Sequence, residues 1–243
     1  MTSYCVLPVT GIPELREGDD LAALIVERAE LKDGDVVVVA QKAISKIEGR
    51  VVRLDAIEPS ERAREIAGDD GDPRRIEAIL GEAREVVRVR APLVICETQH
   101  GFICASAGVD TSNAPEPGML VLLPLDPDAS ASRLREALRE RTGRTVGVVV
   151  TDSFGRPWRQ GTTDVAIGAA GVEVLRDLTG ERDPTGYALR ATVIAVADEI
   201  AGAAQLVSGK LDRVPVTILR GLDIAGDGRA TDIPVPAERD LFR

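Results

Sequence analysis

The chain is organised around Val148-Val-Val-Thr-Asp-Ser-Phe-Gly-Arg-Pro-Trp-Arg-Gln-Gly161, where an apolar run gives way to polar residues. The valines predict a buried strand, because short β-branched apolar runs are typical of strands that are covered on both faces. The strand is expected to end at Asp152 and Ser153 and to enter a Gly/Pro loop. An aspartate at the carboxyl end of a strand is a common metal-ligand position in enzymes that act on nucleotides.

The predicted loop carries two arginines and the single tryptophan of the chain. Arg156 and Arg159 are candidates for gripping phosphate or carboxylate oxygens, because a guanidinium offers two parallel donors. Trp158 has two interpretations, an anchor packed on a neighbouring element or a platform on which a ring stacks.

Similar patterns along the chain predict the remaining elements. β-Branched apolar runs predict strands at residues 36–40, 93–97, 102–105, 119–123, 146–150, 192–197 and 214–219. Helical periodicity predicts helices at residues 20–30, 74–82, 130–142 and 198–206. The third helix is expected to be capped by Ser130 or Ser132.

These elements do not alternate strictly, so the sequence favours an α+β fold with mixed sheets and flanking helices over a doubly wound sheet. Residues 1–243 are expected to form a single domain, with two intertwined subdomains as the alternative. Residues 67–75 predict a polar surface excursion. Residues 221–243 predict an extended tail that wraps the body or a partner subunit.

The bulk composition excludes several classes of protein. The net charge of −10 argues against sequence-independent nucleic-acid binding. No apolar run is long enough to span a membrane, and the N-terminus lacks the pattern of a signal peptide. Three cysteines without CxxC spacing (Cys5, Cys96 and Cys104) are typical of reduced thiols, so we expect a cytoplasmic protein.

A second polar loop follows the predicted strand at residues 102–105. Asp110, Thr111, Ser112 and Asn113 gather four oxygen-bearing side chains. Such a loop suits a hard cation such as Mg²⁺ or Mn²⁺. An Asx-turn, in which Asp110 or Asn113 caps its own backbone, explains the same residues. His100 is expected to order this loop and not to act as a base.

The third candidate segment is Gln41-Lys-Ala-Ile-Ser-Lys46. On a helix, Lys42 and Lys46 would share a face, and an anion such as a triphosphate would offset their mutual repulsion. An ordinary solvated helix start explains them equally well. The sequence contains no P-loop, no GxGxxG fingerprint and no GxSxG elbow.

Five segments together resemble the coenzyme F420-0:γ-glutamyl ligase family, in that family's order and over essentially the whole chain. They are Pro8-Val-Thr-Gly-Ile-Pro13, Gln41-Lys-Ala-Ile-Ser-Lys46, His100-Gly-Phe-Ile-Cys-Ala-Ser-Ala-Gly-Val-Asp-Thr-Ser-Asn113, Thr151-Asp-Ser-Phe-Gly-Arg-Pro-Trp-Arg159 and Glu238-Arg-Asp-Leu-Phe242. The resemblance is to the stand-alone form and not to the fusion with a nitroreductase-like domain.

The resemblance implies a ligase of coenzyme F420 biosynthesis. GTP would phosphorylate a carboxylate of coenzyme F420-0, and the amine of L-glutamate would attack the acyl phosphate, releasing GDP and phosphate. Further γ-linked glutamate would be added to F420-1. The resemblance also implies Mg²⁺ or Mn²⁺, leaves a K⁺ requirement open, and predicts an intertwined homodimer.

The resemblance also implies roles for individual residues. One metal would be held by the catalytic residues Asp110 and Asp152, and Ser153 would reach a second metal. The nucleotide would be bound by Ile12, Pro13, Glu14, Leu15, Gln41, Lys42, Lys46, Asn113, Ser208, Gly209 and Lys210. Lys210 stands at or near a position where some relatives have a metal-binding Glu or Gln, so it is expected to contact phosphate instead. Arg156, Trp158 and Arg159 are our own candidates, from their charge and position, for binding substrate.

Two other classes of function use the same residues. A metal-dependent phosphohydrolase would use the two aspartates to activate water. A module that binds a nucleotide or a deazaflavin would form no product.

Overall fold

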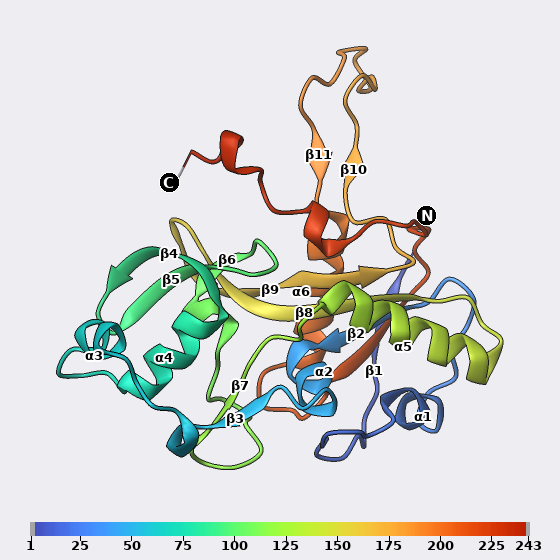
Figure 1. Cartoon of the computed structure of the whole chain (residues 1–243). Helices are drawn as coiled ribbons and strands as arrows, with labels where there is room; N and C mark the ends of the chain where they lie inside the picture. Colours follow the sequence, from blue (N-terminus) through green and yellow to red (C-terminus); the bar gives the residue numbers. More distant parts are fainter. Residues whose placement is uncertain (1–2, 242–243) are drawn as a thin grey trace.

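The computed structural model describes residues 3–241, which form an α+β structure with several sheets (Figure 1). The strands are β1 (Cys5–Pro8), β2 (Val36–Ala40), β3 (Val51–Arg53), β4 (Ala83–Arg90), β5 (Leu93–Thr98), β6 (Ile103–Ala105), β7 (Met119–Val121), β8 (Gly147–Arg156), β9 (Arg159–Ala170), β10 (Arg176–Asp177), β11 (Val193–Ile194) and β12 (Val216–Arg220). The helices are α1 (Leu21–Val26), α2 (Gln41–Ile47), α3 (Glu61–Ala67), α4 (Pro73–Glu82), α5 (Pro127–Thr142) and α6 (Val196–Ser208), with 3₁₀ turns η1 (Leu54–Ala56), η2 (Ser106–Gly108), η3 (Ala230–Asp232) and η4 (Ala237–Arg239).

A five-stranded mixed sheet in the order β1-β12-β2-β8-β9 forms the centre of the fold. Only β2 and β8 pair in parallel, and the other neighbours are antiparallel. Alternate valines of β2 and β8 face opposite ways, as the pleat requires. On one face Val37 and Val148 pack with residues of α1, α2 and α5, and on the other Val38 and Val149 pack with residues of α6. This double coverage explains why β2 and the valine run at residues 148–150 of β8 are apolar at every position.

A second core lies beneath the three-stranded sheet β4-β5-β6. Ile76 and Ile79 of α4 pack there with Ala63 of α3 and with Val94 and Cys96 of β5. In Figure 1 this part lies to the left of the central sheet, and β6 approaches β8. The short pairs β3–β7 and β10–β11 complete the fold, and β10–β11 leads into an arm that extends away from the body.

The structure confirms the strand at residues 36–40 and places strands or helices close to most other predicted ones. Several boundaries were wrong, and the helix expected at 20–30, for example, is α1 and ends at Val26. The strand expected at 192–197 is only two residues long, because Val196 already begins α6. The helix expected at 130–142 begins at Pro127 and is capped by Asp126, whose carboxylate accepts from the Ala129 N–H at 2.9 Å. A capping aspartate followed by proline at the first helical position is a regular helix start, so neither Ser130 nor Ser132 is the cap.

The predicted strand end at Asp152 was also wrong. β8 continues to Arg156 and turns at Pro157 and Trp158 into β9, so the supposed loop is the outer half of a β-hairpin. Residues in this half are mostly exposed, and they therefore lack the apolar alternation that marks a strand.

Residues 221–232 run along the body as far as the 3₁₀ turn η3, whereas the segment after it, which carries η4, stands away from the body in Figure 1. The Ile224 carbonyl accepts from the Glu173 N–H at 2.8 Å, and Ala230 is fully buried. The prediction of a tail that wraps the body is confirmed for residues 221–232. Phe242, the last residue of the fifth segment, lies outside the described residues.

Asp128 joins this tail to the central sheet. It is 3% exposed, and its Oδ1 accepts from the backbone N–H groups of Ala169 in β9 (2.8 Å) and Ala230 in η3 (2.9 Å). Oδ2 accepts from the hydroxyl of Thr231 at 3.0 Å. A single buried carboxylate therefore holds a helix, a strand and the tail together.

We expect Asp128→Ala to lower the free energy of unfolding by about 2–3 kcal/mol, because two buried N–H donors lose their acceptor. Urea denaturation of the purified variant measures this loss. Asp126→Ala is the matched control on the same helix, since it removes only an N-cap and should cost about 1 kcal/mol. Equal losses in the two variants would contradict the joining role of Asp128.

Within residues 3–241, no helix combines the length and the apolar character that crossing a bilayer requires.

Candidate functional site

A cleft of about 150 Å³ lies where the three-stranded sheet meets the central sheet. Its walls come from separate parts of the chain: β6 with the turn η2, the start of the β8–β9 hairpin, α4 and the loop after α6. The lining residues are Arg75, Cys104, Ala105, Ser106, Gly108, Val109, Asp110, Asp152, Ser153, Phe154, Gly155 and Lys210. The two aspartates predicted from sequence therefore lie in one cleft, together with Ser153 and Lys210.

Asp110 is held in the cleft by a backbone bridge and by a lysine. Its N–H and carbonyl exchange hydrogen bonds with Val121 at the end of β7. Its Oδ2 lies 2.5 Å from Nζ of Lys42 and accepts from the Ser112 hydroxyl at 2.8 Å, while Oδ1 accepts from the Ser112 N–H. Burial alone raises the pKa of this carboxyl, but the bonds from Lys42 and Ser112 outweigh it and lower the pKa to about 2. Asp110 is therefore a carboxylate at neutral pH.

The bond from the Ser112 N–H is the Asx-turn that the sequence left as an alternative. The turn and a binding role do not compete, because the turn uses Oδ1 whereas Oδ2 faces an ammonium group. Asp110 forms the turn and still presents a charged oxygen to a cation.

Asp152 lies on β8 where the strand leaves the covered part of the sheet. Burial most of all, and then the carboxylates of Asp164 and Asp110, raise the pKa of its carboxyl, whereas the Ser153 N–H and the nearby Lys42 lower it. The net pKa is about 6. Two carboxyl groups with pKa values near 2 and near 6 share a half-buried cleft. A bound cation would relieve their repulsion.

Ser153 is bonded to a residue that the sequence did not single out. Its hydroxyl donates to Oδ1 of Asp164 at 2.6 Å, across the pair Ser153–Asp164 of the hairpin. The Thr151 hydroxyl lies 3.3 Å from Oδ2 of the same carboxylate. Gln205 of α6 accepts the Asp164 N–H at 3.0 Å. Because side chains alternate along a strand, Ser153 and Thr151 share one face of β8 and Asp152 lies on the other.

Helix α2 follows β2 without an intervening loop and carries the predicted lysines. Lys42 contacts both Asp110 and Ser112, the latter at 2.9 Å. Lys46, one turn later, is 8% exposed and pairs with Glu14. The helix prediction for this segment is thus correct, and each ammonium faces an acceptor from a distant loop. Gln41 is buried and donates to the Leu122 carbonyl at 2.9 Å, so its side chain fastens the helix.

The other residues assigned to the nucleotide are not part of the lining of the cleft. Ile12 and Leu15 are buried in the core beside α1 and α2, whereas Pro13 and Glu14 are exposed between them. Asn113 is exposed with a positive φ of 55°. Ser208 ends α6, and Gly209, with φ 59°, turns the chain toward Lys210.

The three candidates for binding substrate lie at the hairpin turn, outside the lining of the cleft. Arg156 and Arg159 are exposed, and Trp158 is 84% exposed with φ 55°. Both interpretations of Trp158, as an anchor and as a stacking platform, stay predictions.

His100 and Cys104 support the cleft from beneath. Nε2 of His100 lies 3.0 Å from the Pro124 carbonyl, and its ring stacks on Phe102, which meets Phe154 edge to face. This agrees with an ordering role for the histidine. Burial and the Asp152 carboxylate raise the pKa of the Cys104 thiol to about 12, so it is not a thiolate nucleophile at neutral pH.

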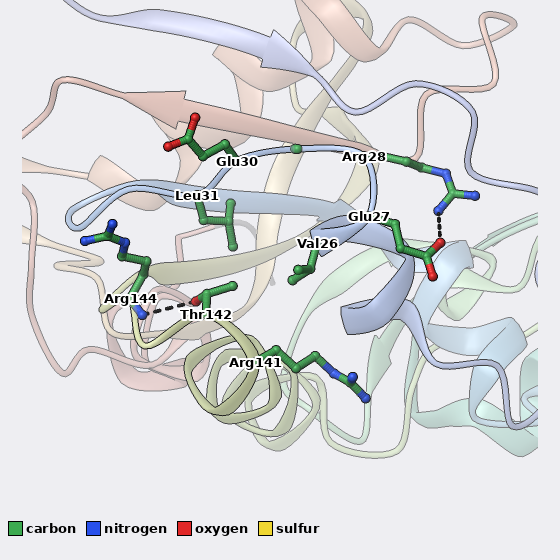
Figure 2. A pocket seen from close by; sticks show the side chains of 9 residues that line it. Val26, Glu27, Arg28, Glu30, Leu31, Arg141, Thr142 and Arg144 are labelled. Atoms are coloured by element: carbon green, nitrogen blue, oxygen red, sulfur yellow. Dashed lines mark hydrogen bonds and ion pairs between the residues drawn. The ribbon is translucent and has the colours of Figure 1, made fainter.

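A larger depression of about 570 Å³ lies between residues 26–31 and the end of α5 (Figure 2). Its arginines are already paired with carboxylates: Arg28 with Glu27 at 3.0 Å, Arg144 with Asp33 at 3.1 Å, and Arg141 with Asp20. The smaller cleft brings together charged groups that face one another from distant segments, and we therefore place the site there.

Sequence reasoning missed two residues of this region, Asp164 and Arg75. Asp164 reaches Ser153 through the register of β8 with β9, which a single sequence does not reveal. Arg75 belongs to the segment interpreted as a surface excursion, but α4 begins at Pro73 and its first turn brings Arg75 to the cleft. The helix-start pattern Asp72-Pro73 was the available signal.

The donor set of the cleft fits a hard divalent cation. Within residues 3–241, no cluster of three or more His, Cys, Asp or Glu side chains suited to a metal occurs. Mg²⁺, however, usually takes one or two carboxylates and completes its shell with water and substrate phosphates. Asp110 and Asp152 supply two carboxylates of this kind, and the ammonium of Lys42 against Oδ2 of Asp110 shows that a cation is accommodated there.

Comparison with known proteins gives a consistent result. The model of the F420-0:Gamma-glutamyl ligase family matches residues 11–221. The protein named Coenzyme F420:L-glutamate ligase from Methanopyrus kandleri is 48% identical, over 97% of this chain and 96% of its own length. Proteins of the same name from Archaeoglobus fulgidus and Methanothermobacter thermautotrophicus are 45% and 43% identical, each over 98% of this chain and over 96% and 98% of their own lengths.

Proposed function

Because the chain belongs to the F420-0:gamma-glutamyl ligase family, we propose that it joins L-glutamate to coenzyme F420-0 by an amide bond, with GTP as phosphoryl donor. A carboxylate oxygen of the precursor takes the γ-phosphoryl group and GDP leaves. The amine nitrogen of glutamate then attacks the acyl carbon, loses a proton and displaces phosphate. Addition of further glutamate to F420-1 follows the same steps.

The observation that carries this proposal is the meeting of Asp110 and Asp152 in one cleft, with Lys42 on the Asp110 carboxylate. Phosphoryl transfer depends on positioning and on neutralising charge, more than on a covalent nucleophile of the protein. Asp110 and Asp152 would hold Mg²⁺ or Mn²⁺, which when bound neutralises phosphate charge. Ser153, with Asp164 behind its hydroxyl, is the proposed ligand of a second ion, and K⁺ stays open as a further requirement.

The proposed nucleotide site runs from the loop at Pro13 and Glu14 across α2 to the loop after α6. Lys42 exchanges its carboxylate partner for phosphate oxygens when the nucleotide and metal enter. Lys46 lies one turn behind it, and Lys210 approaches from the opposite wall. The exposed Asn113 contributes an amide at the rim.

A homodimer is part of the proposal. The arm that β10 and β11 begin carries Tyr187, which is 57% exposed, and Val193, which is 50% exposed. Apolar side chains on a projecting arm favour a protein contact, and a second copy of the chain is the proposed partner. Light scattering during size-exclusion chromatography measures the mass of the protein in solution, which distinguishes a monomer from a homodimer.

We expect purified protein supplied with GTP, Mn²⁺, L-glutamate and coenzyme F420-0 to release phosphate and to form the precursor extended by glutamate. Mass spectrometry identifies the product and counts the glutamates, and ATP in place of GTP measures the nucleotide preference. Phosphate release should require both glutamate and precursor.

Two other outcomes of this assay would replace the proposal. Phosphate release from GTP alone would indicate a metal-dependent phosphohydrolase. Binding of GTP or precursor without phosphate release would indicate a binding module.

A further inference from the structure

Arg75 is the arginine that lines the cleft, and it comes from the wall opposite the central sheet. It lies in the first turn of α4, and its Nη2 donates to the hydroxyl of Ser106 at 3.1 Å. Ser106 is 7% exposed and begins the turn η2, where Ser106, Ala107 and Gly108 all have positive φ values, of 57°, 49° and 73°. The tight turn and the packing of α4 hold the guanidinium at the edge of the cleft.

The charge of Arg75 is not balanced by a carboxylate. Within residues 3–241, no ion pair forms between Arg75 and an acidic side chain, and its partner is the neutral Ser106 hydroxyl. Its neighbour Arg74, by contrast, pairs with Asp72 at 2.7 Å, and Arg50 pairs with Glu82 at 2.7 Å. A partly buried cation that faces a single hydroxyl retains most of its desolvation cost, and an anion entering the cleft would offset that cost.

The shape of the group selects the kind of anion. A guanidinium presents parallel N–H donors that match the two oxygens of a carboxylate. The aspartates and Lys42 on the central-sheet side suit a cation and phosphate oxygens, whereas Arg75 approaches from the other side. Arg156 and Arg159 are exposed at the hairpin turn and do not line the cleft.

We infer that Arg75, held by Ser106, binds a carboxylate of one of the two acids that are ligated. The carboxylate belongs either to L-glutamate or to the F420 precursor, and kinetics separates the two sources. This inference rests on the proposed function, because that function supplies two carboxylate substrates. It makes Arg75 a substrate-binding residue and assigns it no part in holding the metal.

The test compares Arg75→Gln and Arg75→Lys with the matched control Arg74→Gln, which alters the adjacent, mostly exposed arginine of the same helix. Arg75→Gln is expected to raise KM for one carboxylate substrate by about 10- to 100-fold, since a charge-assisted bidentate contact is lost. Arg75→Lys should recover part of this loss. KM for GTP should change less than about twofold, and Arg74→Gln should behave like the wild type. Whichever KM rises identifies the source of the carboxylate.

Mn²⁺ affinity, measured by electron paramagnetic resonance without substrates, should be the same in Arg75→Gln and wild type. Unchanged KM values for both acids, or equal rises for both acids and GTP, would overturn the inference. Thermal unfolding of each variant separates a folding defect from a binding defect, and Arg75→Lys carries the test if Arg75→Gln does not fold.

If the wild type forms no ligated product, the proposed function fails but the anion site can still be measured. Calorimetric titrations with L-glutamate and with the F420 precursor should then show that wild type and Arg74→Gln bind at least one of the two acids and that Arg75→Gln loses this binding. Equal binding by all three, or no binding by the wild type, would overturn the inference.

Discussion

Asp152→Asn should lower kcat by on the order of 10³-fold or more. A neutral amide binds a divalent cation more weakly than a carboxylate does, and without the cation the charge of the phosphate is not offset. Asp152 lies in the cleft with Asp110, and the side chain is nearly unchanged in size by this substitution. Steady-state product formation with saturating Mn²⁺ measures the loss, and calorimetry should show weakened Mn²⁺ binding. Near-normal ligation by Asp152→Asn would remove the assignment of this residue to the metal.

The same substitution should stabilise the metal-free protein. The folded protein raises the pKa of Asp152 from 3.8 to about 6, so folding favours the protonated form. The contribution of this pKa shift to the free energy of unfolding is fully present below pH 3.8 and is lost as the pH rises through about 6. Above that pH the wild type carries a partly buried carboxylate and the asparagine variant does not. We expect Asp152→Asn to gain about 1–3 kcal/mol at pH 8 and less at pH 5.

Thermal unfolding in a chelating buffer at the two pH values measures this gain. With saturating Mn²⁺ the wild type should instead be more stable than Asp152→Asn, because the metal stabilises the protein that binds it. Asp198→Asn is the matched control: burial also raises the pKa of Asp198, which accepts from the Ala166 N–H at 2.9 Å on the other face of the sheet. This control should leave turnover unchanged. A metal-free Asp152→Asn protein less stable than wild type at pH 8 would contradict the electrostatic argument.

Arg220→Met should lower the free energy of unfolding by about 3–5 kcal/mol, because it leaves a buried carboxylate without its counter-charge. Asp35 is 1% exposed, and its two oxygens accept from Nε and Nη2 of Arg220, each at 2.7 Å. The hydrogen bond to Asp35 raises the pKa of Arg220. Methionine preserves much of the apolar stem of arginine but none of its donors.

Urea denaturation at neutral pH measures the effect, and two further variants define its origin. The double variant Asp35→Asn with Arg220→Met should recover a large part of the loss, since no charge then stays buried. Arg144→Met breaks the exposed pair with Asp33 and should cost less than about 1 kcal/mol. Similar costs for Arg220→Met and Arg144→Met would show that the burial of Asp35 does not govern the result.

The sequence predicted the β-branched runs that are covered on both faces. Val36–Ala40 is an example, since every position of β2 faces helices or neighbouring strands. The sequence missed the buried inner half of β9, which is rich in alanine and glycine. It did not predict the outer half of the β8–β9 hairpin, because exposed strand residues carry no apolar pattern. Short elements such as β3 and α3 were also missed, and each depends on packing against distant segments.

The residues of the candidate site also fall into two groups, those that the sequence predicted and those that it missed. Asp110 and Asp152 stand in polar runs directly after apolar ones, and the sequence marks both. Asp164 and Arg75 carry no such mark, because strand register brings the first to Ser153 and the docking of α4 brings the second to the cleft. Local patterns identify residues at the ends of elements, whereas contacts between elements depend on the tertiary fold.

The buried carboxylate of Asp128 also sets a lower limit on how far the chain can be shortened. The family model matches only to residue 221, but the N–H of Ala230 and the hydroxyl of Thr231 donate to Asp128 beyond that point. Ile224 and Ala230 bury their side chains in the core beneath α6. A truncation after β12 would leave the Asp128 carboxylate without the donors of Ala230 and Thr231, and it would also expose apolar surface that the tail covers. We therefore expect the smallest autonomously folding unit to extend at least through Thr231.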